Sequence, residues 1–110
     1  KLSEEEEETL KLINEYRKQN GLEELKTYSK LQKTARIKAL DIVKVGYFSH
    51  NSPTYGSPFD MMKQFGISYR TAGENIAKGQ KTPQEVVTAW MNSEGHRKNI
   101  LNQLIIEIRR

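Results

Sequence analysis

The sequence predicts a helix-rich α+β fold, and three observations support this prediction. Apolar residues recur at helical spacing over most of the 110-residue chain. Serine, threonine and proline stand where helices would begin, and glycine stands where they would end. One short run near the end of the chain has apolar residues at every second position, the period of a β-strand. The length is typical of one domain, so we expect residues 1–110 to form a single domain.

The first helix is predicted over residues 4–20. An acidic run at Glu4–Glu8 suits the positive end of a helix dipole, and Asn20 followed by glycine is typical of a helix end. Apolar and aromatic residues then fall on one helical face. This face is formed by Leu10, Ile13 and Tyr16.

A second helix is predicted over residues 30–45. Ser29 and Gln32 have the spacing of a capping box, in which the serine accepts a backbone hydrogen bond and the glutamine returns one. Gly46 would end this helix. Its apolar stripe consists of Leu31, Ala35, Ile37, Ala39, Leu40, Ile42 and Val43.

Residues 46–57 have the composition of a loop, and a short helix should follow Ser57 with Pro58 at its first position. We expect three residues of this helix to face one way, and a short extended piece to follow it. The helix face is formed by Phe59, Met62 and Phe65, and the extended piece is indicated by Ile67 and Tyr69.

The last part of the chain predicts two helical segments and a strand. Thr82 and Glu85 form a further capping box with Pro83 between them, followed by a helix in which we expect Trp90 to belong to the core. Gly95 would break this helix, one more helical turn would follow, and the alternating run would form the strand. The turn covers residues 96–101 and the strand residues 104–109.

Composition excludes several classes of protein. There are no cysteines, which excludes disulfide scaffolds, thiol catalysis and cysteine-bound zinc, and no apolar run is long enough to span a membrane. The net charge is +4, the sum of −2 over residues 1–30 and +6 over residues 31–110. Such a basic body suits anionic partners or serves solubility alone, but no cluster of basic and aromatic residues indicates nucleic acid binding. Because the chain begins at Lys1, the lack of a signal peptide says nothing about export.

Three residues are candidates for a functional site. The only two histidines, His50 and His96, each stand beside a turn, where an imidazole can bind a metal or act as a base. The alternative is that both are structural, hydrogen-bonded residues. Glu74 follows a glycine and precedes an apolar pair, so its carboxylate needs a partner or caps a turn. No serine nucleophile elbow and no glycine-rich phosphate loop are present.

Four segments together resemble the CAP superfamily, which comprises the cysteine-rich secretory proteins, antigen 5 and pathogenesis-related 1, and whose domain is also called SCP. They occur in the family's order and spacing, and the resemblance covers nearly the whole chain. The lack of cysteine and the Gly-His-Arg-x-Asn-Ile-Leu motif are similar to the bacterial secreted branch. The segments are Phe48-Ser49-His50-Asn51, Ala72-Gly73-Glu74-Asn75-Ile76-Ala77, Val86-Val87-Thr88-Ala89-Trp90-Met91-Asn92-Ser93 and Gly95-His96-Arg97-Lys98-Asn99-Ile100-Leu101.

The resemblance implies an α-β-α sandwich with a cleft that carries two histidines and two glutamates and, in some members, binds zinc or another divalent ion. His50, Glu74 and His96 match three of these positions, and Glu74 is also a candidate general base. The second glutamate falls on Ser93, with Glu94 adjacent. A shift of one residue turns a helical side chain by about 100°, so these two are weaker candidate ligands.

The resemblance also implies further C-terminal strands, because the family continues beyond the point where this chain ends. We therefore expect truncated sheet strands, and we expect residues 103–109 to pack poorly or to pair with another chain, since an open sheet edge invites pairing.

Three functions follow from the resemblance. The first is a secreted or cell-surface binding module with an ion in its cleft and a lipid, a cell-wall polymer or a protein as partner. The second is a metal-dependent, peptidase-like hydrolase that uses the same cleft. The third is a structural domain in envelope or spore assembly. The resemblance favours binding over catalysis.

Overall fold

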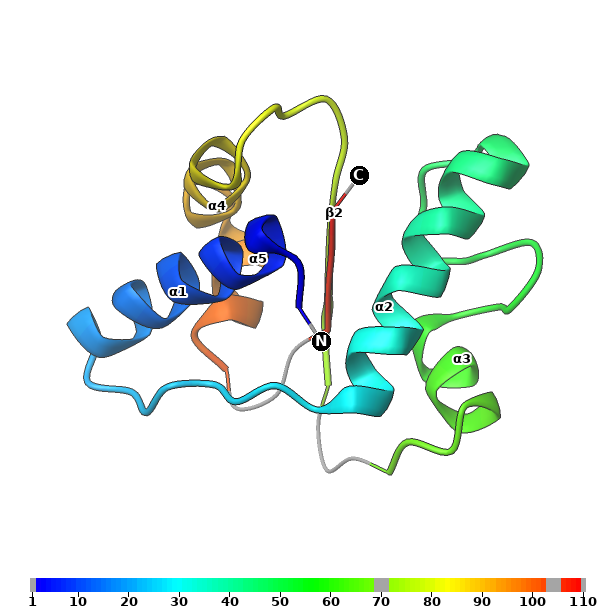
Figure 1. Ribbon diagram of the computed structural model, residues 1–110, viewed down its shortest axis with the longest axis horizontal. Helices are drawn as coiled ribbons and strands as arrows, with labels where there is room; N and C mark the ends of the chain where they lie inside the picture. The colour runs from blue at the N-terminus through cyan, green and yellow to red at the C-terminus, as the bar shows by residue number, and fades with distance from the viewer. Residues whose placement is uncertain (1, 69–71, 103–105, 110) are drawn as a thin grey trace.

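The fold is a two-stranded sheet between two layers of helices, and it is seen in a computed structural model that describes residues 2–68, 72–102 and 106–109. Figure 1 shows the strands edge-on, with α1, α4 and α5 on one side and α2 and α3 on the other. The predicted helix-rich α-β-α sandwich is confirmed. The elements are α1 (Glu4–Gln19), α2 (Ser29–Asp41), the π-helical turn η1 (Ile42–Gly46), α3 (Pro58–Gln64), β1 (Glu74–Ala77), α4 (Pro83–Met91), α5 (Glu94–Ile100) and β2 (Ile106–Arg109).

The two strands run parallel, with Glu74 opposite Ile106 and Ala77 opposite Arg109. The prediction of a strand near the end of the chain is confirmed for residues 106–109, which pair with β1. Residues 103–105 lie outside the described residues, so self-association through 103–109 stays a prediction. The extended piece predicted at Ile67 is not part of a strand, and Tyr69 also lies outside the described residues.

Most helix starts are set by capping, with one correction. Ser57 caps α3 in a capping box with Asp60, and the Thr82 hydroxyl accepts from the backbone N–H of Glu85 at 3.1 Å. The prediction that Ser29 caps the second helix is wrong. Tyr28 occupies the N-cap position and Ser29 is the first helical residue, because the helix begins one residue earlier than the serine pattern indicates.

Gly95 does not break the helical region where we expected. It lies inside α5, which begins at Glu94, while α4 ends at Met91. The interruption between the two helices therefore falls at residues 92–93, and His96 lies in the first turn of α5.

The core has two parts, one on each side of β1. Ala77 packs in the cluster on the side of α1 and α4, and Ile76 packs in the cluster on the side of α2 and α3. Alternate residues of a strand point to opposite faces, so this short strand serves both layers. The first cluster consists of Ile13, Ala77, Val86, Val87, Trp90 and Ile100, and the second of Ile42, Met62, Ile67 and Ile76.

Two polar residues of α1 hold the extended segment that crosses from one layer to the other. Asn14 exchanges two hydrogen bonds with the backbone of Leu25, at 2.7 and 3.1 Å. The guanidinium of Arg17 donates to the carbonyl oxygens of Glu23 and Ile100, both at 2.8 Å. Together they connect α1 to the 22–28 segment and to the end of α5.

The predicted apolar stripes of α2 and α3 are partly wrong. Leu40 and Val43 are 65% and 54% exposed, and Phe59 of α3 is also exposed. The apolar stripe predicted for α2 is partly wrong because the buried face of this helix includes polar residues. Leu40 is two residues from the buried Lys38 and is therefore turned to the opposite face. The buried polar residues of α2 are Thr34, Lys38 and Asp41.

Candidate functional site

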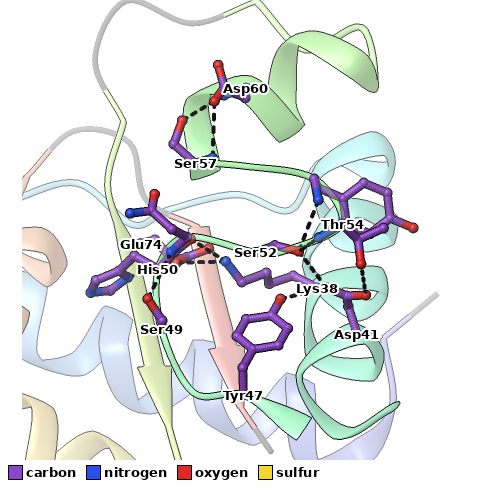
Figure 2. Close-up of polar contacts among 12 residues, drawn as sticks. Lys38, Asp41, Tyr47, Ser49, His50, Ser52, Thr54, Ser57, Asp60 and Glu74 are labelled. Atoms are coloured by element: carbon purple, nitrogen blue, oxygen red, sulfur yellow. Dashed lines mark hydrogen bonds and ion pairs between the residues drawn. The ribbon is translucent and has the colours of Figure 1, made fainter. Parts of the chain in front are cut away.

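The sequence-predicted residues His50 and Glu74 meet directly. His50 lies in the loop between η1 and α3, and Glu74 is the first residue of β1. The Nδ1 atom of His50 lies 2.8 Å from Oε1 of Glu74, as Figure 2 shows. An ionised carboxylate only accepts hydrogen bonds, so Nδ1 carries the proton and Nε2 keeps a free lone pair in the neutral ring. The side chain of Glu74 is 3% exposed and that of His50 is 53% exposed, so the pair presents the imidazole to solvent.

Lys38 is a member of this site that the apolar pattern of the sequence does not predict. Its Nζ atom lies 3.5 Å from Oε1 of Glu74 and donates a hydrogen bond to the carbonyl oxygen of His50. Figure 2 shows its side chain reaching from α2 towards both residues. The side chain is 1% exposed, so its charge and that of Glu74 neutralise each other in a buried setting.

The spacing of polar residues could have revealed Lys38. Thr34, Lys38 and Asp41 recur at intervals of four and three residues, which places them on one face of a helix. The apolar stripe of α2 draws attention to other positions. When a helix carries such a polar stripe beside an apolar stripe, and both stripes face the interior, the polar residues are expected to form a buried hydrogen-bond network.

Asp41 holds the loop that carries His50. Its carboxylate accepts hydrogen bonds from the hydroxyls of Tyr47 at 2.7 Å, Ser52 at 2.6 Å and Thr54 at 2.9 Å. Burial works to raise the pKa of Asp41, but these hydrogen bonds outweigh it and hold the pKa below its ordinary value. Burial also raises the pKa of Tyr47 to about 12. The loop is therefore fastened on both sides of His50 to a single buried carboxylate.

His96 approaches from the opposite layer. Its carbonyl oxygen accepts a hydrogen bond from the buried Asn75 side chain at 3.1 Å, and its ring centroid lies 6.3 Å from that of Trp90. Burial lowers the pKa of His96, and the neighbouring His50 lowers it further. His50 and His96 thus come from opposite layers, and each is hydrogen-bonded to one of two adjacent residues of β1.

Asn99 explains why the Gly73-Glu74-Asn75 motif needs its glycine. The side-chain amide of Asn99 donates to the carbonyl oxygen of Glu74 at 3.1 Å and to Oδ1 of Asn75 at 2.8 Å. A Cβ atom at Gly73 would lie 2.5 Å from Oδ1 of Asn99, closer than real contacts allow. The motif on β1 and the helix that carries His96 are thus joined by side-chain amides.

Trp90 has the structural role that the helical spacing predicts. It is almost fully buried, and its indole N–H donates to the carbonyl oxygen of Ile76 at 3.2 Å. It therefore fixes α4 against β1. A large aromatic residue of this kind combines burial with one directed hydrogen bond.

The structure does not bring the predicted metal ligands together in one cluster. Among residues 2–68, 72–102 and 106–109, no three histidine, aspartate or glutamate residues gather closely enough to hold a metal. The Oε1 atom of Glu74 faces Lys38 and His50, Ser93 occupies the N-cap position of α5, and Glu94 is exposed on its first turn. The candidate nitrogen donors are the imidazoles of His50 and His96, and the first is oriented by a carboxylate. This donor chemistry suits Zn²⁺-like ions, whose histidine ligands commonly bond a carboxylate through the other ring nitrogen.

A cavity of about 250 Å³, which neither histidine lines, lies between α1, the 25–28 segment and the start of α2. Its lining combines apolar and polar side chains. The apolar and aromatic lining residues are Leu2, Leu10, Leu25, Tyr28, Leu31 and Trp90. In the described part of the chain, no helix combines the length and apolar character that crossing a membrane requires.

Comparison with known proteins identifies relatives among bacterial proteins. The model of the family described as "CAP: Cysteine-rich secretory protein family" matches residues 10–104. The uncharacterized protein YkwD of Bacillus subtilis is 65% identical over 97 residues, which are 88% of this chain and 38% of YkwD. The uncharacterized membrane protein YlbC of the same organism is 37% identical over 97 residues, 88% of this chain and 28% of YlbC.

A solved structure has the same fold. It is the 1.5 Å crystal structure of an extracellular protein containing an SCP domain from Bacillus anthracis, with a TM-score of 0.84 and 34% sequence identity. The match covers 87% of this chain and 32% of that protein. The chain thus spans between about a quarter and two-fifths of the length of the proteins it matches.

Proposed function

The chain belongs to the CAP family of cysteine-rich secretory proteins, in its cysteine-free bacterial branch, and from this premise we propose that it is an extracellular or cell-surface binding module. The module holds a divalent cation of the zinc type between His50 and His96. The description of the Bacillus anthracis relative as extracellular supports the location. The hydrogen bond between His50 and Glu74 is the observation that supports the ion site.

In this site the two histidines are the ligands and Glu74 is a positioning residue. Its carboxylate accepts from Nδ1 of His50 and so directs the free lone pair of the ring to Nε2. This differs from the expectation that the family resemblance raises, in which Glu74 is itself a ligand. A bound zinc ion would supply a Lewis acid or an ion bridge to a partner, and the remaining coordination positions would be open to water or that partner.

Hydrolysis is less well supported than binding. A general base needs a carboxylate or imidazole free to accept a proton from water. The Oε1 atom of Glu74 lies within 3.5 Å of Lys38 and within 2.8 Å of His50. With Oε1 engaged by both groups, Glu74 is poorly placed to take a proton from water, and a hydrolase would have to use the free Nε2 of His50 as its base. The preference for binding over hydrolysis therefore rests on the family resemblance.

The partner class follows only from the family resemblance. A lipid, a cell-wall polymer and a protein all stay predictions. The cavity between α1 and α2 is a place where an apolar group of such a partner would fit, since its lining includes Leu10, Leu25 and Leu31.

Zinc titration by calorimetry tests the proposed ion site. We expect one zinc ion per chain at neutral pH, and we expect His50→Ala and His96→Ala each to abolish measurable binding. Glu74→Gln should weaken binding by about 10- to 100-fold without abolishing it, because an outer-sphere partner orients a ligand but does not bind the ion. Asn51→Ala, at an exposed residue beside His50, is the matched control and should bind as the unaltered chain does. Zinc binding that survives the loss of both histidines would contradict the proposal.

A further inference from the structure

Exposed apolar side chains gather where α2 ends. Six large apolar or aromatic side chains are exposed among the described residues, and four of them fall within residues 40–48. Single exposed apolar residues are ordinary, but several gathered in one place are typical of a surface that meets a partner or a membrane. The four residues are Leu40, Val43, Val45 and Phe48, and their exposure ranges from 43% to 65%.

The end of α2 and the loop after β1 form one end of the molecule, which we call the α2 tip and define as residues 37–51 and 77–84. Leu40 and Val43 are three residues apart and are therefore neighbours on the helix surface. Phe48 follows in the loop after η1. Figure 1 shows the end of α2 and the loop between β1 and α4 at the same end of the molecule.

The α2 tip is basic as well as apolar. Lys44 is exposed between two of the apolar residues. The ammonium of Lys78, which is also exposed, lies 5.9 Å from the ring centroid of Phe48 and so joins the two segments. The only acidic residue of the α2 tip is Asp41, which is buried. These two segments therefore present positive charge and apolar side chains to solvent, without an exposed carboxylate of their own.

We propose that the α2 tip is the surface by which this chain binds a lipid membrane that carries negative charge. Lysines attract anionic headgroups, and apolar side chains enter the boundary between headgroups and acyl chains. A soluble anionic polymer would engage the lysines alone and leave the apolar side chains in water. A lipid surface matches both features. This inference goes beyond the proposed ion site and does not depend on it.

Vesicle sedimentation tests the inference with the chain as it is. The chain should bind vesicles of equal parts phosphatidylglycerol and phosphatidylcholine at least about 10-fold more tightly than vesicles of phosphatidylcholine alone. The reason is that each lysine near an anionic surface contributes about 1 kcal/mol, or roughly a fivefold gain in affinity. Binding should weaken as salt is added, because salt screens exposed charges.

Two variants separate the apolar from the electrostatic contribution. Phe48→Ser should weaken binding about 10-fold, since an aromatic side chain no longer enters the interface. Lys44→Gln should weaken it about fivefold. The matched controls are Phe59→Ser, at an aromatic residue of similar exposure on α3, and Lys33→Gln, at an exposed lysine nearer the start of α2. Both controls should bind as the unaltered chain does.

Two results would overturn the inference. One is equal binding to the two kinds of vesicle. The other is a Phe48→Ser variant that binds as tightly as the unaltered chain, which would leave only the general attraction of a basic protein. Thermal melting checks that each variant folds, and Leu40→Ser replaces Phe48→Ser in the same comparison if the latter does not.

Zinc titration is read separately from the vesicle assay. A chain that binds zinc but not anionic vesicles overturns this inference and leaves the ion site standing. A chain that binds anionic vesicles through Phe48 and Lys44 but does not bind zinc supports the inference, while the proposed ion site fails.

Discussion

The two helical layers differ in what their buried polar side chains bond to. On the side of α1, α4 and α5, Ile13, Val86 and Ile100 are fully buried, and the buried Thr9, Asn14 and Arg17 bond to backbone groups. On the side of α2, η1 and α3, an apolar cluster around Ile42 and Met62 lies beside a buried polar network. That network consists of Lys38, Asp41, Ser52 and Glu74.

This difference suggests that the residues that stabilise the fold and the residues that position His50 lie mainly in different layers. Burial of apolar side chains stabilises a fold in proportion to the area removed from water. A buried ion pair such as that of Lys38 and Glu74 must offset the loss of hydration of both charges, and is weak evidence for stability. We infer that the first layer supplies most of the free energy of folding, whereas the second retains charges that position His50.

The largest expected effect lies in the apolar layer. Ile13→Ala should lower the free energy of unfolding by about 2–5 kcal/mol, since Ile13 has no exposed surface and its truncation leaves a cavity. Urea denaturation measures the change. Leu40→Ala, at a residue that is 65% exposed, is the control and should change the free energy by no more than about 0.5 kcal/mol. At a temperature where the Ile13 variant stays folded, its zinc affinity should be unchanged. A loss of binding there would contradict the separation of the two layers.

An intermediate effect is expected at Asp41. Asp41→Asn should destabilise the chain by about 1–3 kcal/mol, because a neutral amide cannot accept from three hydroxyls as the carboxylate does. It should also weaken zinc binding, since the His50 loop loses its anchor. Urea denaturation and zinc titration measure the two effects. Tyr47→Phe removes one of the three hydrogen bonds and should have a smaller effect in the same direction.

The pH dependence of the Asp41 variant provides an independent check. Because the folded chain lowers the pKa of Asp41, the stabilisation is present above its unfolded pKa and is lost as the pH falls through the folded pKa. Asp41→Asn should therefore lose part of the acid sensitivity of the unaltered chain. An equal acid sensitivity in both would argue against the network as its source.

The smallest effect on stability is expected at the ion pair between Glu6 and Arg36, which joins α1 to α2. Glu6 of α1 accepts hydrogen bonds from Arg36 of α2 at 2.6 and 2.9 Å, and this pair holds the pKa of Glu6 at about 2, below its usual 4.5. Both side chains are more than a third exposed, so the pair contributes little to stability. The contribution is present above pH 4.5 and is lost as the pH falls towards 2. Glu6→Gln should flatten that part of the curve of melting temperature against pH; an unchanged curve would show that the pair does not couple the layers.

Local patterns in the sequence predicted much of the fold and the candidate site. The caps at Ser57 and Thr82 are set by residues within a few positions of each other. The burial of Trp90 and the strand near the end were predicted from the local spacing of apolar residues, although Trp90 bonds Ile76 and the strand pairs with β1, both distant in the sequence. The family motifs also placed His50 and Glu74 together, although they are 24 residues apart.

Only the tertiary structure decided which face of α2 is buried and what Glu74 does. Helical periodicity shows which residues share a face, but it does not show which face a neighbouring element covers, so the outward position of Leu40 and the burial of Lys38 were missed. The role of Glu74 depends on Lys38, which comes from another element and lies 36 residues earlier in the sequence. The sequence by itself therefore determined the elements and the candidate residues. The charge that neutralises the carboxylate, and with it the expected chemistry of the site, depends on how the two layers pack around one strand.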